Sequence, residues 1–347
     1  MEKNAIAIVV LNWNNAPDTI DCVESLLHSI TEVNLTIFIT DNGSEDDSVS
    51  RFIRWLNGKN IEFSHFNTKK SIWKNPVSKE HPSRICLLEN DENLGFAKGN
   101  NVALHFALEQ YPVDFDRYLL LNNDTIVPGK SLRRLLETAN KHPDFKAWTP
   151  VICYADEREK VWNAGGFLIW WGERKYIAHK QPRNSLPTKG IRQITFITGC
   201  ALLMDRKLLE DGIFLNEDFF FGEEDYYFSK QMKRLNLKMG VAFESVIYHK
   251  VGTSSNHISP KSQLPLLLIH FMNRIVDMKK WMNPLTFAFW KPGFVLHAVF
   301  NTWWKRWYSF SVLWKFTRLL VKHSRGKSRV TREDFFGAGK LFVNDKV

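Results

Sequence analysis

Residues 117–130, RYLLLNNDTIVPGK, decide the fold that the sequence predicts. The apolar run at residues 118–121 is bounded by turn residues, which is typical of a strand covered on both faces in a parallel sheet. Asn122, Asn123 and Asp124 then fall at the carboxyl end of this strand. Ligands of open α/β sheets bind at that edge, and strand residues two apart face the same side, so we expect Asn122 and Asp124 to face one ligand.

The same pattern of a strand followed by a helix occurs four times in the first half of the chain. The apolar strand-like runs are residues 5–11, 35–40, 84–88 and 118–121, and each is followed by apolar residues at helical spacing. The second helix is expected to begin near Ser44, which precedes several acidic residues. Four such units predict a parallel, doubly wound α/β sheet. Residues 58–83 are expected to form a polar surface insertion.

Each of these strands ends in a polar cluster. The clusters begin at Asn12, Asp41, Asn90 and Asn122. Turns favour Asn, Asp and Gly whatever the protein does, and this alone would explain any single cluster. Four clusters at one sheet edge, with Asp41 in the second and Asp124 in the fourth, favour a nucleotide-type ligand.

Length and cysteine content describe a globular chain. At 347 residues and 44% hydrophobic composition, it is long enough for one large domain or two. Its four cysteines form no C-x-x-C pair, so neither a zinc site nor a disulfide framework is expected, and a reducing compartment fits best. The first residues carry no basic leader and no cleavage site, so we expect residues 5–11 to be a strand and not part of a signal peptide.

The positive charge is concentrated near the carboxyl end. Residues 278–332 contain twelve Lys or Arg and no Asp or Glu, which accounts for more than the whole net charge of +10. They also contain six of the thirteen tryptophans. The longest stretch there without a charged residue, residues 292–304, is too short to span a bilayer.

Basic and aromatic residues interleaved in this way are typical of helices that lie in a membrane interface. Segments that bind nucleic acid have the same composition. However, no recognisable nucleic-acid-binding module accompanies residues 278–332, so we expect no nucleic-acid partner. We therefore predict peripheral attachment to the cytoplasmic face of the cell membrane. An amphipathic helical hairpin that only caps the enzyme is the alternative.

Seven short motifs occur in an order that resembles the family 2 glycosyltransferases of the GT-A fold, especially the bacterial rhamnosyltransferase-like branch. They are VVLNWNN (9–15), TDNGSEDDS (40–48), NLGFAKGNN (93–101), LLLNNDT (119–125), ITGCALLMDR (197–206), FFFGEEDYYFSKQ (219–231) and IYHKVGTSS (247–255). The resemblance implies a GT-A domain, a Rossmann-like and mostly parallel sheet with flanking helices, over residues 1–260. Residues 1–130 would form its nucleotide-sugar-binding half and residues 131–260 its acceptor half. Residues 261–347 would form a helical membrane-associating region.

The resemblance also implies the donor and metal sites. The nucleotide sugar, linked to dTDP or UDP, would contact Asn12, Asn14, Asp41, Asn93, Gly95, Lys98, Asn101, Asn122 and Asn123. Mg²⁺ or Mn²⁺ would be held by Asp124 and His249, because hard cations on oxygen ligands stabilise a diphosphate leaving group. Asn122 stands where the family has the first aspartate of its D-x-D element, so metal affinity from this element alone is expected to be weaker. His249 has a second reading, as the polar end of a strand at residues 245–248.

The catalytic and acceptor residues follow from the same resemblance. Asp225 is the expected base and Glu224 its partner, although acidic residues in a first helical turn are usually complements of the helix dipole. Phe228 and Gln231 depart from the family pattern, which has Leu and Arg at these positions. Gly165, Gly166, Gly199 and Cys200 would lie near the acceptor. The nearby tryptophans, Trp162, Trp170 and Trp171, would stack on a sugar or fill the core.

The expected function is that of an inverting glycosyltransferase in bacterial cell-envelope polysaccharide biosynthesis. It would move a sugar, rhamnose in the branch it resembles, to a hydroxyl of a glycan or lipid-linked glycan. A nucleotidyltransferase on a similar sheet is the first alternative, and the absence of a Gly-rich basic loop near the first strand weighs against it. A catalytically inactive, membrane-docked nucleotide-sugar-binding protein is the second, and the Glu224-Asp225 pair weighs against it.

Overall fold

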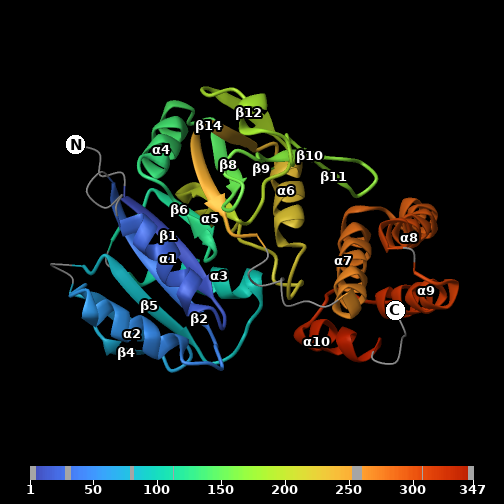
Figure 1. Cartoon of the computed structure of the whole chain (residues 1–347), viewed down its shortest axis with the longest axis horizontal. Coiled ribbons are helices and arrows are strands. Elements are labelled where there is room, and N and C mark those ends of the chain that lie inside the picture. Colours follow the sequence, from blue (N-terminus) through green and yellow to red (C-terminus); the bar gives the residue numbers. More distant parts are fainter. Residues whose placement is uncertain are drawn as a thin grey trace.

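The computed structural model describes residues 5–27, 33–78, 82–111, 113–251, 260–306 and 308–342. Figure 1 shows an α/β body with helices on both faces of a sheet, and a group of C-terminal helices gathered at one end of the molecule. The predicted α/β class with a mostly parallel sheet is confirmed.

The centre of the sheet is made of strands that follow the apolar runs of the sequence. They are β1 (Ala5–Asn12), β2 (Asn34–Asn42), β5 (Ile85–Asn90) and β6 (Arg117–Asn122). β1 pairs in parallel with β2 and with β6, and β2 pairs in parallel with β5, so these strands end at one edge. Nearly all their residues are buried, as expected for strands covered by helices on both faces.

The prediction of a polar surface insertion at residues 58–83 is wrong. β3 (Phe63–Asn67) adds to the sheet in parallel with β5, and β4 (Ile72–Asn75) closes that side as an antiparallel strand. The residues of β3 are mostly buried and those of β4 are mostly exposed. The short strand β3 itself contains the buried polar residues Ser64, His65 and Asn67, so it shows no apolar run in the sequence.

The other half of the sheet is mixed in direction. It contains β7 (Thr125–Ile126), β8 (Phe145–Tyr154), β9 (Val161–Asn163), β12 (Ile191–Ile194), β13 (Ala201–Asp205) and β14 (Lys238–His249). β13 is antiparallel to both β6 and β8, and β14 is parallel to β8, so β14 ends at the same edge as β6. β10 (Gly166–Leu168) and β11 (Arg174–Tyr176) form a separate hairpin, followed by the 3₁₀ turn η1 (Arg183–Ser185).

Helices cover both faces of the sheet, which makes it doubly wound. One face carries α1 (Ala16–Leu27), α2 (Ser48–Gly58) and α4 (Ser131–Lys141), and the other carries α3 (Phe96–Glu109), α5 (Arg206–Glu210) and α6 (Glu224–Arg234). The second helix begins at Ser48 and not near Ser44. The reason is that the backbone N–H and the hydroxyl of Ser44 both donate to Asp41, which keeps Ser44 in the loop.

The carboxyl-terminal part consists of α7 (Pro260–Trp281), α8 (Pro284–Arg306), α9 (Phe310–Ser324) and α10 (Arg332–Lys340). A core cluster joins these helices to the sheet body, because it also contains Phe196, Phe219 and Tyr226. In the described ranges, no helix combines the length and the apolar character that crossing a membrane requires. The predicted boundary at residue 260 falls at the start of α7, and the shared cluster crosses it, so the division into residues 1–260 and 261–347 stays a prediction.

Candidate active site

The carboxyl ends of β1, β2, β5, β6 and β14 place most of the predicted site residues along one sheet edge. The register aligns Asn12 with Asp41 at the ends of β1 and β2. At the end of β14, His249 is aligned with Thr125 of β7, the residue after Asp124. Residues far apart in the sequence are thus brought together by the pairing of the strands.

Asn12 and Asp41 form a buried hydrogen-bonded network. Asn12 Nδ2 donates to Asp41 Oδ2 at 2.8 Å, and the Ser44 hydroxyl donates to the same oxygen at 2.7 Å. Burial raises the pKa of Asp41, while the bonds from Ser44 and Asn12 oppose that rise. Asn14 has a left-handed backbone (φ 52°), and its Oδ1 accepts from the backbone N–H of Glu45 at 2.8 Å. This network fixes the two loops against each other.

The segment that opens α3 is fixed by a second network. Asn93 Oδ1 accepts from Asn42 Nδ2 at 3.0 Å and from the backbone N–H of Gly95 at 2.9 Å. Gly95 has φ 83°, and a Cβ there would lie 2.3 Å from the carbonyl oxygen of Phe220, so only glycine fits. Lys98 is exposed.

Asn101 is placed differently from the other predicted donor residues. Its amide nitrogen donates to the carbonyl oxygen of Leu215 at 2.8 Å and to Glu217 Oε1 at 2.9 Å. Its Oδ1 accepts from the backbone N–H of Leu215 at 3.2 Å. The side chain therefore holds the segment at 215–217 against α3, and a contact with the donor stays a prediction.

A polar cavity of about 490 Å³ lies beside the ends of β2 and β5. Its size falls within the usual range for small-molecule sites. Its lining includes Asp41, Ser44, Asn67, Lys69, Lys74 and Asn90. The β3–β4 hairpin, whose role the sequence did not reveal, thus supplies Asn67 and the three lysines Lys69, Lys70 and Lys74 to the edge where the predicted donor residues lie.

Asp124 and His249 form a close pair of opposite charge. Asp124 Oδ1 lies 3.0 Å from His249 Nε2, and both side chains are less than a tenth exposed. Burial disfavours the charged imidazolium, but Cys200 and Asp124 outweigh it and raise the pKa of His249. The ring of Trp162 meets the imidazole edge to face, with the ring centroids 4.4 Å apart. His249 is the last residue of β14, as its second reading predicts, and its role at a metal stays a prediction.

These side chains fit a divalent cation. A carboxylate oxygen and an imidazole nitrogen that has lost its proton suit Mn²⁺, and an oxygen-rich remainder suits Mg²⁺. The side-chain oxygen of Asn122, two residues before Asp124, is buried and has no hydrogen-bond partner among the described residues. Asn123 donates to the Thr19 hydroxyl at 3.0 Å. No cluster of three or more His, Cys, Asp or Glu suited to a metal occurs in the described ranges, so this pair would rely on further ligands from the donor and water.

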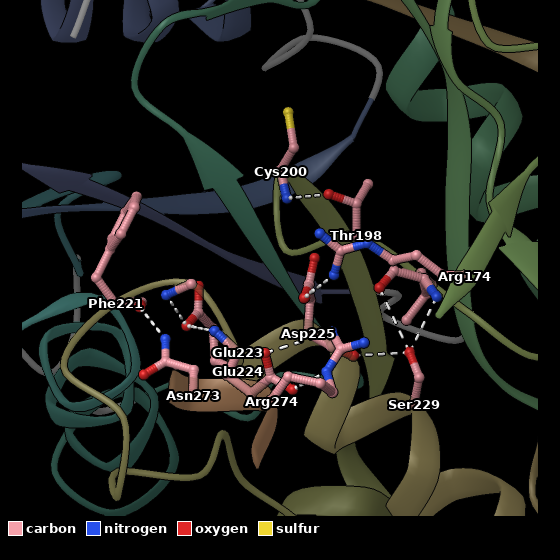
Figure 2. Close-up of polar contacts among 12 residues, drawn as sticks. Arg174, Thr198, Cys200, Phe221, Glu223, Glu224, Asp225, Ser229, Asn273 and Arg274 are labelled. Atoms are coloured by element: carbon pink, nitrogen blue, oxygen red, sulfur yellow. Dashed lines mark hydrogen bonds and ion pairs between the residues drawn. The ribbon is translucent and has the colours of Figure 1, made fainter. Parts of the chain in front are cut away.

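The carboxylates at the start of α6 differ in their surroundings, as Figure 2 shows. Glu224 Oε2 accepts from the backbone N–H groups of Gly222 and Glu223, at 2.7 and 2.9 Å. Asp225 Oδ1 lies 3.4 Å from Arg174 Nη1, and its side chain keeps 19% of its surface exposed. Glu224 thus closes the turn before the helix, and Asp225 is the more accessible of the two.

The electrostatics of this pair combine burial with nearby cations. Burial raises the pKa of Glu224 to about 7, and the charge of Asp225 adds to the rise. Burial also raises the pKa of Asp225, while Arg174 and Arg274 act against that rise. The two arginines therefore favour the ionised, proton-accepting form of Asp225.

The loop Thr198-Gly199-Cys200 is close to both the carboxylates at the start of α6 and the Asp124–His249 pair. The Cys200 N–H donates to the Thr198 hydroxyl at 3.3 Å. The backbone of Gly199 opposes the rise in the pKa of Asp225, and Cys200 raises the pKa of His249. Cys200 is only 3% exposed and lies in the core cluster on the α1 face of the sheet. A role of its thiol at an acceptor stays a prediction that this burial does not favour.

Gly165 and Gly166 shape the hairpin that carries Arg174. Gly165 has φ 73°, and its N–H donates to Asn163 Oδ1 at 2.7 Å. A Cβ on Gly166 would lie 2.5 Å from the carbonyl oxygen of Lys175, so the two strands approach closely there. Their predicted acceptor contact is untested. Of the nearby tryptophans, Trp162 and Trp171 pack against core clusters, and Trp170 is 79% exposed.

Three residues at this site were not assigned from the sequence: Arg174, Glu223 and Arg274. Arg174 comes from β11 and Arg274 from α7. Both are far from Asp225 along the chain, so the sequence does not indicate that they lie near it. Glu223 belongs to the EED motif, but the family resemblance assigned roles only to the next two residues, Glu224 and Asp225.

Comparison with known proteins shows the fold. No protein-family model and no curated protein sequence matches the chain. The structure of GalNAc-T7 with UDP, GalNAc and Mn²⁺ matches with a TM-score of 0.55 and 12% identity, over 80% of this chain and 48% of that one. The chain thus spans about half of GalNAc-T7.

A second structure matches over most of its length. The mannosyltransferase PcManGT from Pyrobaculum calidifontis, in complex with GDP-Man and Mn²⁺, has a TM-score of 0.52 and 13% identity, over 97% of this chain and 86% of that one. At sequence identities this low, the matches show a shared fold and do not show a shared substrate. The chain has the fold of the GT-A glycosyltransferases.

Proposed function

We propose that this protein is a metal-dependent glycosyltransferase that moves a sugar from a nucleoside diphosphate to a hydroxyl acceptor, with inversion. The observation that carries the proposal is the loop at residues 198–200. The backbone of Gly199 opposes the rise in the pKa of Asp225, and Cys200 raises the pKa of His249, so the loop is close to both the proposed proton acceptor and the proposed metal pair. Both structural neighbours were solved with a nucleotide or nucleotide sugar and Mn²⁺, which supports the donor class.

The donor would lie along the ends of β1, β2, β5 and β6. Asp41 and its cavity would take the nucleoside, and Asp124 with His249 would hold the cation beside the diphosphate. A divalent cation bound there supplies Lewis-acid stabilisation of the leaving diphosphate. UDP, GDP and dTDP sugars are the donors to test, and the rhamnosyltransferase-like motifs make dTDP-rhamnose the first of them.

The chemical step is a single displacement. The acceptor oxygen bonds to the anomeric carbon as the bond from that carbon to the diphosphate oxygen breaks, and its electron pair leaves with the nucleoside diphosphate. The acceptor proton goes to the carboxylate of Asp225, which is partly exposed and kept ionised by Arg174. Glu224 orients this carboxylate by closing the preceding turn. The acceptor is a glycan or a lipid-linked glycan.

Donor hydrolysis tests the proposal without a known acceptor. The protein is incubated with UDP-glucose, GDP-mannose or dTDP-rhamnose, with and without Mn²⁺, and the release of nucleoside diphosphate and free sugar is measured. We expect metal-dependent release that Asp225→Asn and Asp124→Ala both abolish. Release of a sugar phosphate and a nucleoside monophosphate would instead identify phosphoanhydride cleavage, and tight binding without any release would identify a binding protein.

We also propose that the exposed apolar face of α8 and α9 docks on an anionic membrane surface, on the cytoplasmic side. The large exposed side chains of α8 recur at helical spacing, and α9 continues them: Leu285, Phe289, Leu296, Phe300, Trp304, Phe310, Trp314 and Val321. Arg318, Lys322 and Arg325 are exposed near them. Apolar side chains flanked by cations fit a bilayer interface that carries negative headgroups.

Sedimentation with vesicles tests this face. The variant Phe289→Ser/Leu296→Ser/Phe310→Ser changes only exposed side chains, so it should fold normally. We expect it to lose binding to vesicles that contain phosphatidylserine, while Ile72→Ser, an exposed apolar residue on β4, keeps it. If the full chain ignores such vesicles and instead forms dimers that the triple variant abolishes, the face binds a second copy and the membrane proposal is wrong.

A further inference from the structure

Helix α7 has a buried polar side, although it belongs to the region that the sequence assigns to the membrane. Asn273, Arg274 and Asp277 are each no more than 2% exposed. Their spacing places them on one side of the helix, because residues four apart are neighbours on its surface. Buried polar groups of this kind are retained where they have partners. The partners show what α7 does.

Arg274 binds two separate segments of the sheet body. Its Nε and Nη2 donate to the two carboxylate oxygens of Glu223, the second at 3.4 Å, and its Nη1 donates to the carbonyl oxygen of Gly172. The guanidinium carbon also lies 3.4 Å from the ring centroid of Tyr226. Figure 2 shows Arg274 close to Glu223 and Asp225.

Each segment is two residues along the chain from Asp225 or from Arg174, the cationic partner of Asp225. Glu223 is two residues before Asp225, at the start of α6. Gly172 is two residues before Arg174, whose Nη1 lies 3.4 Å from Asp225 Oδ1. One guanidinium therefore connects the turn that presents the carboxylate with the turn that presents its cationic partner.

Further contacts of the same helix fix the start and the middle of α6. Asn273 Nδ2 donates to the carbonyl oxygen of Phe221 at 2.8 Å. Lys230 of α6 lies 3.7 Å from Asp277 Oδ2, and the Trp281 indole donates to Asp277 Oδ1 at 2.8 Å. These contacts hold α7 in one register along α6, so the placement of Arg274 is determined on both sides.

We propose that Arg274 is a positioning residue for catalysis, which sets the carboxylate of Asp225 by joining Glu223 and Gly172. This inference rests on the proposed function, in which Asp225 accepts the proton. It gives α7 a role in the acceptor side of the active site, while the proposed membrane face is made by α8 and α9. Arg274 touches no reacting atom, so it acts through its neighbours.

The geometry requires arginine and not only a positive charge. A planar guanidinium binds both oxygens of a carboxylate and a third acceptor at once, whereas a lysine ammonium is a compact point charge. Arg274→Lys should therefore keep the charge and lose the connection to one of the two segments. Arg274→Gln loses the charge as well. The two variants separate positioning from electrostatics.

The test uses hydrolysis of whichever of UDP-glucose, GDP-mannose and dTDP-rhamnose reacts fastest with Mn²⁺. In Arg274→Gln we expect kcat to fall by roughly 10²-fold, the scale for a displaced catalytic group, while KM for the donor stays near wild type. The acid limb of kcat/KM should move to higher pH, because a cation that favours ionised Asp225 is gone while Arg174 and Glu224 remain. Arg274→Lys should restore the pH profile and only part of kcat.

The matched control is Phe316→Leu, since Phe316 of α9 is fully buried in the same cluster as α7 and belongs to no contact of Asp225. We expect it to lower stability with an unchanged acid limb. If Phe316→Leu and Arg274→Gln lose kcat equally with the same acid limb, Arg274 is only a structural residue. Hydrogen exchange separates this failure from failure of the proposed function. Faster exchange at 222–227 and 166–176 in Arg274→Gln supports positioning even without hydrolysis, and unchanged exchange there overturns it.

Discussion

Gly95 offers a prediction whose size follows directly from the geometry. Gly95 has φ 83° and ψ 177°, a conformation that is almost confined to glycine, and a Cβ there would lie 2.3 Å from the carbonyl oxygen of Phe220. That oxygen accepts a hydrogen bond from the N–H of Phe96 at 3.0 Å. In Gly95→Ala the backbone strain costs about 1–3 kcal/mol. The displaced hydrogen bond adds about 0.5–1.5 kcal/mol to the loss of stability.

The expected loss in the free energy of unfolding is therefore about 1.5–4.5 kcal/mol, the sum of the two effects. Gly190→Ala is the matched control, because Gly190 has φ 92° but a Cβ there meets no atom within 4 Å. It should show the strain alone. Urea unfolding measures both variants, and titration calorimetry measures donor binding, which should weaken only in Gly95→Ala. Equal losses of stability, with unchanged donor affinity in Gly95→Ala, would refute the reasoning.

Three further predictions concern the metal, the base and the tail. Asp124→Ala should abolish the Mn²⁺ dependence of donor binding in calorimetry while Asn122→Asp keeps or strengthens it, because the first change removes a ligand and the second adds a carboxylate. Activity should be lost as pH falls through the raised pKa of the base, since Asp225 accepts a proton only when ionised. Because burial raises the pKa of Asp225 and of its neighbour Glu224, the acid limb of kcat/KM should lie above the ordinary range of an aspartate. Truncation after Lys261 should give a protein that unfolds or aggregates, visible by circular dichroism and gel filtration. The reason is that it exposes Phe196, Phe219 and Tyr226, which share a core cluster with the carboxyl-terminal helices.

Much of the fold was predictable because its signals are local. Buried strands leave apolar runs, and the loops that follow them need Asn, Asp and Gly, so the ends of β1, β2 and β6 appear in the sequence at Asn12, Asp41 and Asn122. β3 was not predicted from the sequence, because a short strand beside an exposed edge strand shows no long apolar run.

The site was less predictable because its contacts are tertiary. Arg174 and Arg274 reach Asp225 and Glu223 from a hairpin and a helix that lie about fifty residues away on either side, and nothing in their local sequence indicates this. Composition assigned α7 to the membrane because Lys and Trp dominate the region after it. The buried polar residues that reveal its real neighbours are too few to change that composition.

The pairing of β7 with the end of β14 has a consequence for the order in which the site forms. It aligns Thr125 with His249, residues separated by more than a hundred positions, and so brings Asp124 to the histidine. Contacts this distant form late, because a long loop must close first. A chain still being synthesised would therefore have its proposed nucleoside pocket before it has its proposed metal pair. On the proposed function, metal-dependent chemistry would begin only when the last strand of the sheet is in place.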